Sequence, residues 1–166
     1  MRKINKNVVL IGMPGCGKTT IGNILAQRLS MEFIDIDKYI EEKEERSITD
    51  IFNYGEDYFR KIESKAVEEV SSKFSMVIST GGGVVKLYSN IERLNKNGII
   101  IFVNRPIEDI ISNVDISSRP LLKDGKYKIY NLFKQRYYLY KKYCDYEIIN
   151  DTELNEVVGR IIKCVD

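Results

Sequence analysis

Residues Gly12–Thr19 (GMPGCGKT) fit the pattern G-x-x-x-x-G-K-[ST] and constrain the fold more than any other part of the chain. They follow the apolar run Val8–Ile11, and a helical pattern extends from about Lys18 to Leu29. Glycines in such a loop let several backbone N–H groups converge on a phosphate, and the helix N-terminus adds partial positive charge. An ordinary glycine-rich turn would not need the Lys-Thr pair. The segment therefore predicts a nucleotide-binding loop between a strand and a helix.

The positions of this loop have expected roles in binding ATP. Lys18 would reach the β- and γ-phosphates, and the Thr19 hydroxyl would bind Mg²⁺. The predicted ATP-binding residues of the loop are Gly15, Cys16, Gly17, Lys18, Thr19 and Thr20. Cys16 lies beside Lys18 and a helix N-terminus, surroundings that favour a thiolate. We therefore expect thiol reagents to inactivate the protein.

Chain length and the order of apolar segments predict a single α/β domain over residues 1–166. With 166 residues and 43% hydrophobic content, the chain can bury one substantial core but not two. Helical patterns lie between most of the short β-branched or aromatic runs, which is typical of a parallel sheet covered by helices on both faces. The predicted strands are Val8–Ile11, Phe33–Ile36, Met76–Ser79, Ile99–Val103 and Tyr146–Ile149. An amphipathic pattern predicts a last helix that closes the core, from Leu154 to Val165.

Composition argues against several classes of protein. The 26 basic and 24 acidic residues give a net charge of +2, without the pronounced basic excess of a dedicated nucleic-acid binder. No stretch approaches the roughly 20 apolar residues needed to span a bilayer. We expect a cytoplasmic protein with reduced cysteines and no nucleic-acid or membrane partner. The Lys- and Tyr-rich segment 137–143 is the one candidate surface for single-stranded nucleic acid, although its helical spacing favours packing against the core.

Carboxylates for a phosphate site lie after the second predicted strand. Many phosphate-loop proteins place an aspartate at the end of a neighbouring strand, but the run 76–80 is followed by Gly81–Gly83. Asp35 and Asp37 are expected to supply the acids, on one side of an extended chain at the carboxyl edge of the sheet. Because the chain has no histidine, any general base must be a carboxylate, a lysine, a tyrosine or water. The alternative is that Asp37 caps a helix beginning near Lys38 and that Asp35 is solvated.

Six motifs occur in a fixed order along nearly the whole chain. They are the loop Gly12–Thr19, the pair Asp35 and Asp37, the run Gly55–Glu63, Gly81–Gly83, Arg119–Leu122, and Arg136 followed by Tyr140. Together they resemble the shikimate kinase family, within the nucleoside-monophosphate-kinase-like group of phosphate-loop proteins. The resemblance implies a three-layer α/β/α fold with a five-stranded parallel sheet in the order 2-3-1-4-5. It also implies an enzyme that uses ATP and Mg²⁺ to phosphorylate the 3-hydroxyl of shikimate. We expect the protein to be a monomer.

Roles for individual residues follow from the same resemblance. The implied catalytic residues are Lys18, Asp37 and Arg119; the implied shikimate-binding residues are Asp37, Arg60, Gly82 and Arg136; the implied Mg²⁺ ligands are Thr19 and, through water, Asp35. The substrate-binding region would span about residues 35–63. Arg119 lies in a polar segment at about 112–126, which we expect to be a lid that closes over the phosphates.

Simpler interpretations exist for these residues one at a time. Arg60 and Glu63, three positions apart on a helix, could form a surface ion pair. Gly81–Gly83 could be a plain loop, and Arg119 and Arg136 could be solvated charges. The adenine contacts are the least defined, with Arg105 and the segment 150–152 as candidates.

Two other functions are compatible with a phosphate loop. One is a different small-metabolite kinase, of gluconate or nucleoside-monophosphate type, which would alter the acceptor pocket. The other is a non-catalytic nucleotide-binding regulator, which should have lost Asp37 or Arg119. Both residues are present in the chain.

Overall fold

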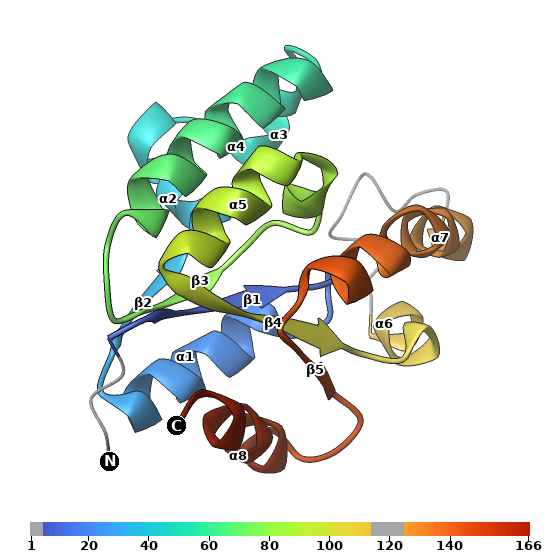
Figure 1. Ribbon diagram of the computed structural model, residues 1–166. Helices are drawn as coiled ribbons and strands as arrows, with labels where there is room; N and C mark the ends of the chain where they lie inside the picture. Colours follow the sequence, from blue (N-terminus) through green and yellow to red (C-terminus); the bar gives the residue numbers. More distant parts are fainter. Residues whose placement is uncertain (1–4, 114–124) are drawn as a thin grey trace.

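The computed structural model describes residues 5–113 and 125–166, which form a parallel sheet with helices on both faces (Figure 1). The strands are β1 (Asn7–Ile11), β2 (Glu32–Asp35), β3 (Met76–Ser79), β4 (Gly98–Asn104) and β5 (Tyr146–Ile149). They lie in the order β2-β3-β1-β4-β5, and every neighbouring pair is parallel. In the centre, Val8 pairs with Val77 on one side and with Ile99 on the other. The predicted strand order and the predicted fold class are confirmed.

Helices connect these strands and cover the sheet. They are α1 (Lys18–Leu29), α2 (Ile36–Glu44), α3 (Ile48–Phe52), α4 (Glu56–Ser71), the 3₁₀ helix η1 (Val84–Lys86), α5 (Tyr88–Lys96), α6 (Ile107–Ser112), α7 (Gly125–Tyr143) and α8 (Leu154–Val165). α1 and α8 pack together on one face of the sheet, and α4 and α5 pack together on the other (Figure 1). α2 and α3 both contact α4, so the segment between β2 and β3 extends beyond the sheet as a helical group.

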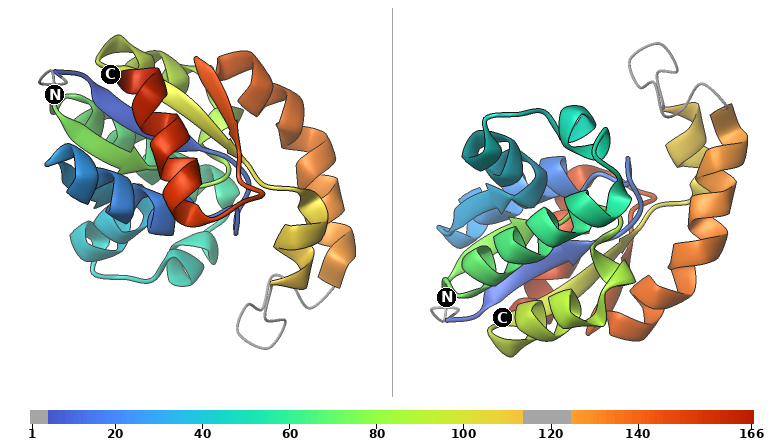
Figure 2. Two further views of the ribbon diagram at one scale, coloured as in Figure 1. Left: turned by 90° about the horizontal axis from the view of Figure 1, so that it is seen from below. Right: turned by 90° about the horizontal axis from the view of Figure 1, so that it is seen from above.

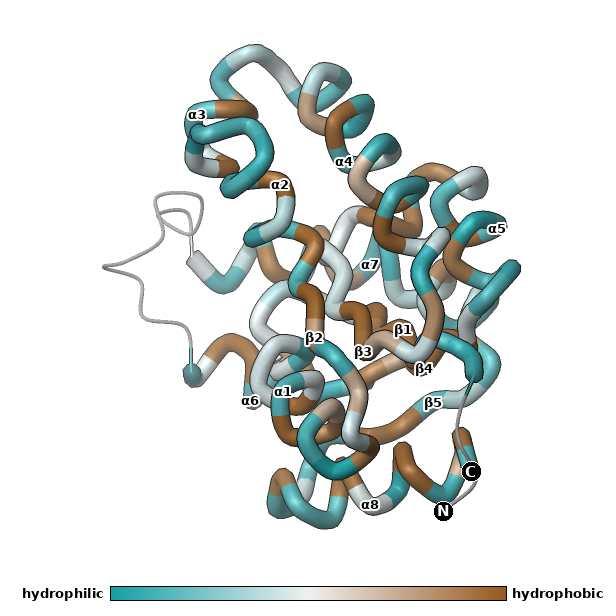
Figure 3. Tube along the Cα trace, turned by 90° about the vertical axis from the view of Figure 1, so that its left-hand side faces the viewer, coloured by the Kyte–Doolittle hydropathy of each residue, from teal (hydrophilic) through white to brown (hydrophobic). Residues whose placement is uncertain are grey.

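The central strands form the hydrophobic core because they are covered on both faces. All five residues of β1 are buried, as are all four of β3. Hydrophobic residues are concentrated along these strands, while the helices alternate between hydrophobic and hydrophilic positions (Figure 3). α8 shows this alternation most clearly, since Val157, Val158 and Ile161 are buried on one side. A continuous apolar strand beside amphipathic helices is the pattern expected of a doubly covered parallel sheet.

The phosphate-loop helix and the last helix have the predicted bounds. α1 follows Gly17, which has a φ of 99°, and ends at Ser30, which has a φ of 54°. Both conformations are left-handed and stop the helical pattern from extending in either direction. The predictions of Lys18–Leu29 and Leu154–Val165 are therefore confirmed.

The end of the second strand differs from the prediction. Ile36 is the first residue of α2 rather than the last of β2, and Asp37 lies in the first helical turn. The Asp35 carboxylate accepts hydrogen bonds from the N–H groups of Asp37 (3.0 Å) and Lys38 (3.3 Å), which starts the helix two residues earlier than expected. The prediction of two aspartates on an extended chain is wrong, and Asp35 rather than Asp37 is the cap.

α6 and α7 lie side by side next to the β4–β5 edge of the sheet (Figure 2). The predicted lid at about 112–126 falls between them: Ser112 ends α6, Gly125 and Lys126 begin α7, and residues 114–124 lie outside the described part of the chain. Arg119 is one of residues 114–124 and so lies outside the described residues. Within residues 5–113 and 125–166, no helix has the length and apolar character needed to cross a membrane.

Candidate active site

The phosphate loop leaves the carboxyl end of β1 and returns into α1. Gly12, Gly15 and Gly17 all have positive φ, at 148°, 79° and 99°, a region that side chains disfavour. The Lys18 ammonium donates to the carbonyls of Gly12 (2.8 Å) and Met13 (2.9 Å). The loop is therefore already curled around a buried lysine, as a phosphate site requires.

Two further predicted positions of the loop differ in accessibility. Thr20, two residues after Lys18, is exposed, so its N–H can face a ligand. The Cys16 thiol is buried, with 1% of the residue exposed, and it contacts Lys18 Nζ at 3.6 Å. Burial of this thiol disfavours the reactivity toward thiol reagents that the sequence predicts, so Cys16 contributes to the loop through its backbone.

Asn150, directly after β5, forms a hydrogen bond with the phosphate loop. Its side-chain N–H donates to the Cys16 carbonyl at 2.9 Å, and its own backbone N–H donates to Asn104 at the end of β4. A β-carbon on Gly17 would lie 3.0 Å from the Asn150 amide nitrogen. The segment 150–152 was expected near the adenine, but the contact that the structure gives Asn150 is with the phosphate loop.

Thr19 and Asp35 lie together at the start of α1. The Thr19 hydroxyl donates to Asp35 Oδ2 at 2.7 Å, while Oδ1 of the same carboxylate caps α2. Asp35 is thus bonded rather than merely solvated. A hydroxyl and a carboxylate in contact present oxygen atoms of the kind that Mg²⁺ binds.

Several charged side chains act on the Asp37 carboxyl, most of them negative. Burial, together with the neighbouring carboxylates of Asp35 and Glu63, raises the pKa of its carboxyl from 3.8 to about 6, while Lys18 opposes the rise. A carboxylate with a pKa near 6 is a stronger base than an exposed aspartate and is still ionised at neutral pH. Asp37 is therefore suited to accept a proton.

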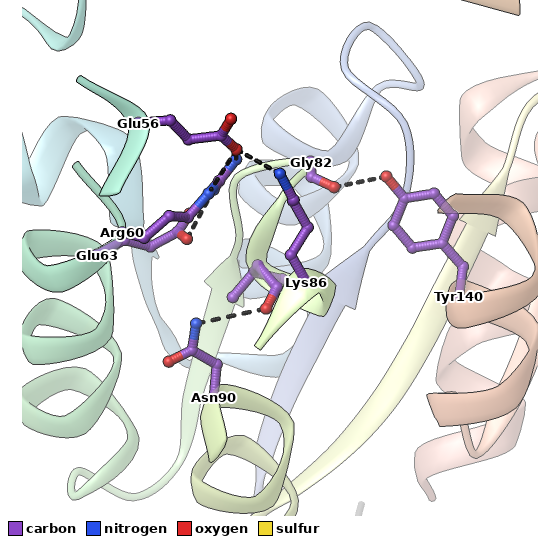
Figure 4. Close-up of polar contacts among 8 residues, drawn as sticks. Glu56, Arg60, Glu63, Gly82, Lys86, Asn90 and Tyr140 are labelled. Atoms are coloured by element: carbon purple, nitrogen blue, oxygen red, sulfur yellow. Dashed lines mark hydrogen bonds and ion pairs between the residues drawn. The ribbon is translucent and has the colours of Figure 1, made fainter. Parts of the chain in front are cut away.

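Arg60 forms a partly buried ion pair, which excludes the simple surface pair that its spacing allows. Arg60 Nη1 donates to Glu63 Oε1 at 2.8 Å, and the two side chains are 12% and 1% exposed. Arg60 Nε and Nη2 donate to Glu56 Oε1 at 3.3 and 3.2 Å, and Glu56 also pairs with Lys86 (Figure 4). Burial raises the pKa of Glu63, and the Arg60 charge opposes that rise. Arg60 is held in place by two glutamates. Lys86 is a member of this network that no sequence motif identifies, and Glu56 lies within the motif run Gly55–Glu63 but had no predicted role.

Arg136, on α7, interacts with the same glutamate as Arg60. Burial raises the pKa values of Glu63, the partner of Arg60, and of Tyr140, and the charge of Arg136 opposes both rises. The Nε atom of Arg136 is buried without a hydrogen-bond partner among residues 5–113 and 125–166. α4 and α7 therefore bring the two predicted arginines to one carboxylate, and one of them has an unused donor.

Each of the three consecutive glycines after β3 faces a different part of this site. A β-carbon on Gly81 would lie 3.0 Å from Asp37 Oδ1, and one on Gly82 would lie 2.6 Å from Cδ of Pro14 in the phosphate loop. A β-carbon on Gly83 would lie 2.2 Å from Arg60 Nη2. The glycine loop is thus a close-packed junction rather than a plain turn.

The described residues thus bring together the loop 12–19, Asp35, Asp37, Arg60, Gly82 and Arg136, at the carboxyl end of the sheet where ligands of open α/β folds bind. Arg119 lies outside the described residues, so its predicted role stays a prediction. The sequence did not single out Tyr140 beyond the motif, although its hydroxyl donates to the Gly82 carbonyl at 2.6 Å. No local signal could have shown that contact, because the two residues are 58 positions apart.

Comparison with known proteins agrees with this arrangement. The family model described as shikimate kinase matches residues 14–166. A shikimate kinase from Clostridium botulinum (strain Eklund 17B) is 51% identical over 162 residues, which cover 98% of this chain and 98% of that protein. The solved structure of Acinetobacter baumannii shikimate kinase in complex with shikimate has a TM-score of 0.92 and 32% identity, over 98% of this chain and 94% of its own.

A more distant neighbour shares the fold alone. The gluconokinase from Sinorhizobium meliloti has a TM-score of 0.61 and 14% identity, over 99% of this chain and 93% of its own. The full-length matches and the six ordered motifs lead to one conclusion: the chain belongs to the shikimate kinase family.

Proposed function

We propose that the protein transfers the γ-phosphoryl group of ATP to the 3-hydroxyl of shikimate through the residues gathered at this site, giving ADP and shikimate 3-phosphate. The observation that carries the proposal is the position of Asp37, whose pKa responds to Lys18 in the phosphate loop and to Glu63 beside Arg60. An acceptor hydroxyl at Asp37 would lie between a phosphate site and a carboxylate-binding arginine. That is the placement an in-line transfer requires.

Arg60 has donors left for a carboxylate. A guanidinium carries five N–H groups, and three of them are used by Glu56 and Glu63. The remaining two can bind the shikimate carboxylate, with the buried Nε of Arg136 as a further donor. Two arginines fixed by packing would hold the ring so that its hydroxyl points at Asp37.

The chemical step needs few groups. Asp37 orients the hydroxyl and takes its proton as the hydroxyl oxygen attacks the γ-phosphorus, and the bond to the β–γ bridging oxygen breaks to release ADP. Lys18 and Arg119 stabilise the charge on the transferring group, while backbone N–H groups at Gly82 and at Gly15–Thr20 contact substrate and phosphates. Membership of the shikimate kinase family supports the proposed reaction.

Mg²⁺ is the proposed cofactor, and the residues present fit it. Thr19 Oγ1 and Asp35 Oδ2 offer oxygen ligands 2.7 Å apart, the latter through water. Among the described residues no three His, Cys, Asp or Glu side chains cluster as a closed metal cage, which agrees with an ion held mainly by phosphates and water. When bound, the ion neutralises charge on the β- and γ-phosphates.

The test is ADP release measured with shikimate, gluconate and nucleoside monophosphates as acceptors. Of these acceptors, we expect only shikimate to support ADP release. ADP release with one of the other acceptors but not with shikimate would refute the proposal. Arg60→Ala should raise the KM for shikimate about tenfold or more, because charge-assisted hydrogen bonds are worth roughly 1.5–3 kcal/mol, and should leave the KM for ATP unchanged. Lys61→Ala removes the neighbouring, exposed charge and serves as the control.

The cysteines bear on the cellular location of the protein. The thiols of Cys16, Cys144 and Cys164 are all free, which supports a reducing, cytoplasmic location. We also propose a monomer, since the site is assembled from the elements of one chain. Light scattering at assay concentration would test this, and a dimer would refute it.

A further inference from the structure

Tyr140 is a completely buried residue of α7 whose hydroxyl reaches the glycine loop. Its O–H donates to the Gly82 carbonyl at 2.6 Å, and its ring stacks on Phe102 of β4 with centroids 5.2 Å apart. Burial raises the pKa of the phenol well above its usual value, so the hydroxyl is protonated and can donate at neutral pH. This hydrogen bond therefore joins α7 to the glycine loop.

The contact fixes the direction of one peptide group. In a trans peptide the carbonyl of one residue and the N–H of the next point in opposite directions, and no peptide bond between described residues is cis. Since the Gly82 carbonyl faces Tyr140, the N–H of Gly83 faces away from α7. Figure 4 shows Tyr140 on one side of Gly82 and Arg60 on the other, so this N–H is directed toward the Arg60 side of the site.

Gly83 has an unused donor in a buried position. The residue is buried, yet its N–H donates to no group within residues 5–113 and 125–166, whereas its carbonyl accepts from Lys86. A buried N–H without a partner is unfavourable in the free protein and is satisfied when a ligand supplies an acceptor. Without side chains of their own, the glycines could rotate this peptide easily, so its direction needs an external support.

Resting on the proposed function, we propose that Tyr140 is a positioning residue for shikimate. Its hydroxyl holds the Gly82–Gly83 peptide so that the Gly83 N–H points at the substrate. The same bond fixes α7 against the loop and thereby places Arg136, one helical turn before Tyr140, near Glu63 and Arg60. Tyr140 does not touch the substrate in this scheme; it acts through Gly83 and Arg136.

Tyr140→Phe tests the proposal because it keeps the ring packing and removes only the hydroxyl. We expect the KM for shikimate to rise about three- to tenfold, because the net contribution of one neutral hydrogen bond corresponds to a change of that size. The KM for ATP should be unchanged. Tyr137→Phe is the matched control, since Tyr137 also contacts Phe102 from α7. A purely structural Tyr140 would lower the melting temperature of Tyr140→Phe and leave both KM values as in the wild type, and that result would overturn the proposal.

A spectroscopic measurement reports on the peptide itself. The chain has 11 glycines, so ¹⁵N-glycine labelling gives a simple amide spectrum, in which Gly83→Ala identifies the Gly83 peak. In the wild type this peak should shift on adding shikimate. In Tyr140→Phe it should differ already in the free protein and respond less to shikimate.

The outcomes separate this proposal from the proposed function. If the wild type turns over shikimate but its Gly83 amide does not respond to the ligand, the positioning role is refuted without any use of the variant. A wild type that shows no shikimate turnover refutes the proposed function instead.

Discussion

Replacing Asp37 by Asn should inactivate the enzyme and stabilise its fold. Burial and the carboxylates of Asp35 and Glu63 raise the Asp37 pKa from 3.8 to about 6. A shift of about two units at about 1.4 kcal/mol per unit means that ionised Asp37 opposes folding by about 3 kcal/mol. Asn has nearly the same shape and no charge, so Asp37→Asn should remove this cost. For a chain of this size, about 3 kcal/mol corresponds to a rise in Tm of about 6–12 °C.

The stabilisation should depend on pH in a defined direction. Because the folded pKa lies above the unfolded one, the cost is absent at pH well below 3.8, where the carboxyl is protonated in both states. It grows as the pH rises and is complete above about pH 6. We therefore expect the full gain for Asp37→Asn at pH 8 and about half of it at pH 5. Thermal unfolding followed by circular dichroism at the two pH values measures both.

Asp57→Asn is the control, since Asp57 occupies the same second position of its helix, α4, but is exposed. It should not stabilise the protein at either pH. In the wild type, kcat/KM for shikimate should fall below about pH 6 as Asp37 is protonated. A lower Tm for Asp37→Asn at pH 8, or a rise in Tm that is the same at pH 5 and pH 8, would show that ionised Asp37 does not destabilise the folded protein.

Two further substitutions test the loop contacts. Gly83→Ala is compatible with the backbone of Gly83 (φ −97°, ψ 4°), but its β-carbon would displace the Arg60 guanidinium, so the KM for shikimate should rise about tenfold with little change in Tm. Gly159→Ala, where a β-carbon meets open space, is the control, and an unchanged KM in Gly83→Ala would argue against Arg60 as a substrate ligand. Thr19→Ala should raise the Mg²⁺ concentration for half-maximal activity about tenfold, whereas Thr19→Ser should retain the wild-type value. A Mg²⁺ titration at fixed ATP measures both. Equal values for the two variants would contradict a ligand role for the hydroxyl.

The parts of the fold that the sequence predicted correctly are those set by local patterns. The strand, loop and helix from Val8 to Leu29 follow from apolar runs, glycine spacing and a helical period, all within about twenty residues. The strand order followed only from the family resemblance, because it depends on contacts between distant segments. At Asp35 the local pattern misled, since alternation of apolar and acidic residues is typical of a strand while the carboxylate starts a helix.

The site contacts that were not predicted join residues far apart in the sequence. Asn150 supports Cys16 across 134 positions, and Tyr140 reaches Gly82 across 58. An asparagine after a strand and a tyrosine on an amphipathic helix are both ordinary in sequence, so their roles emerge only when β5 and α7 are packed beside β4. The burial of Glu63 is equally invisible locally, because its spacing from Arg60 suits an exposed helix pair as well.

The three glycines after β3 are explained by space rather than by backbone conformation. None of Gly81–Gly83 has a positive φ, so a larger residue could adopt the backbone of each. What forbids a side chain is the neighbour that each one faces: the carboxylate of Asp37, the phosphate-loop residue Pro14 and the guanidinium of Arg60. A single alanine at each position would therefore disturb a different function. Because these neighbours come from α2, the β1–α1 loop and α4, the glycine loop fixes their mutual distances, and the Tyr140 hydroxyl fixes the loop.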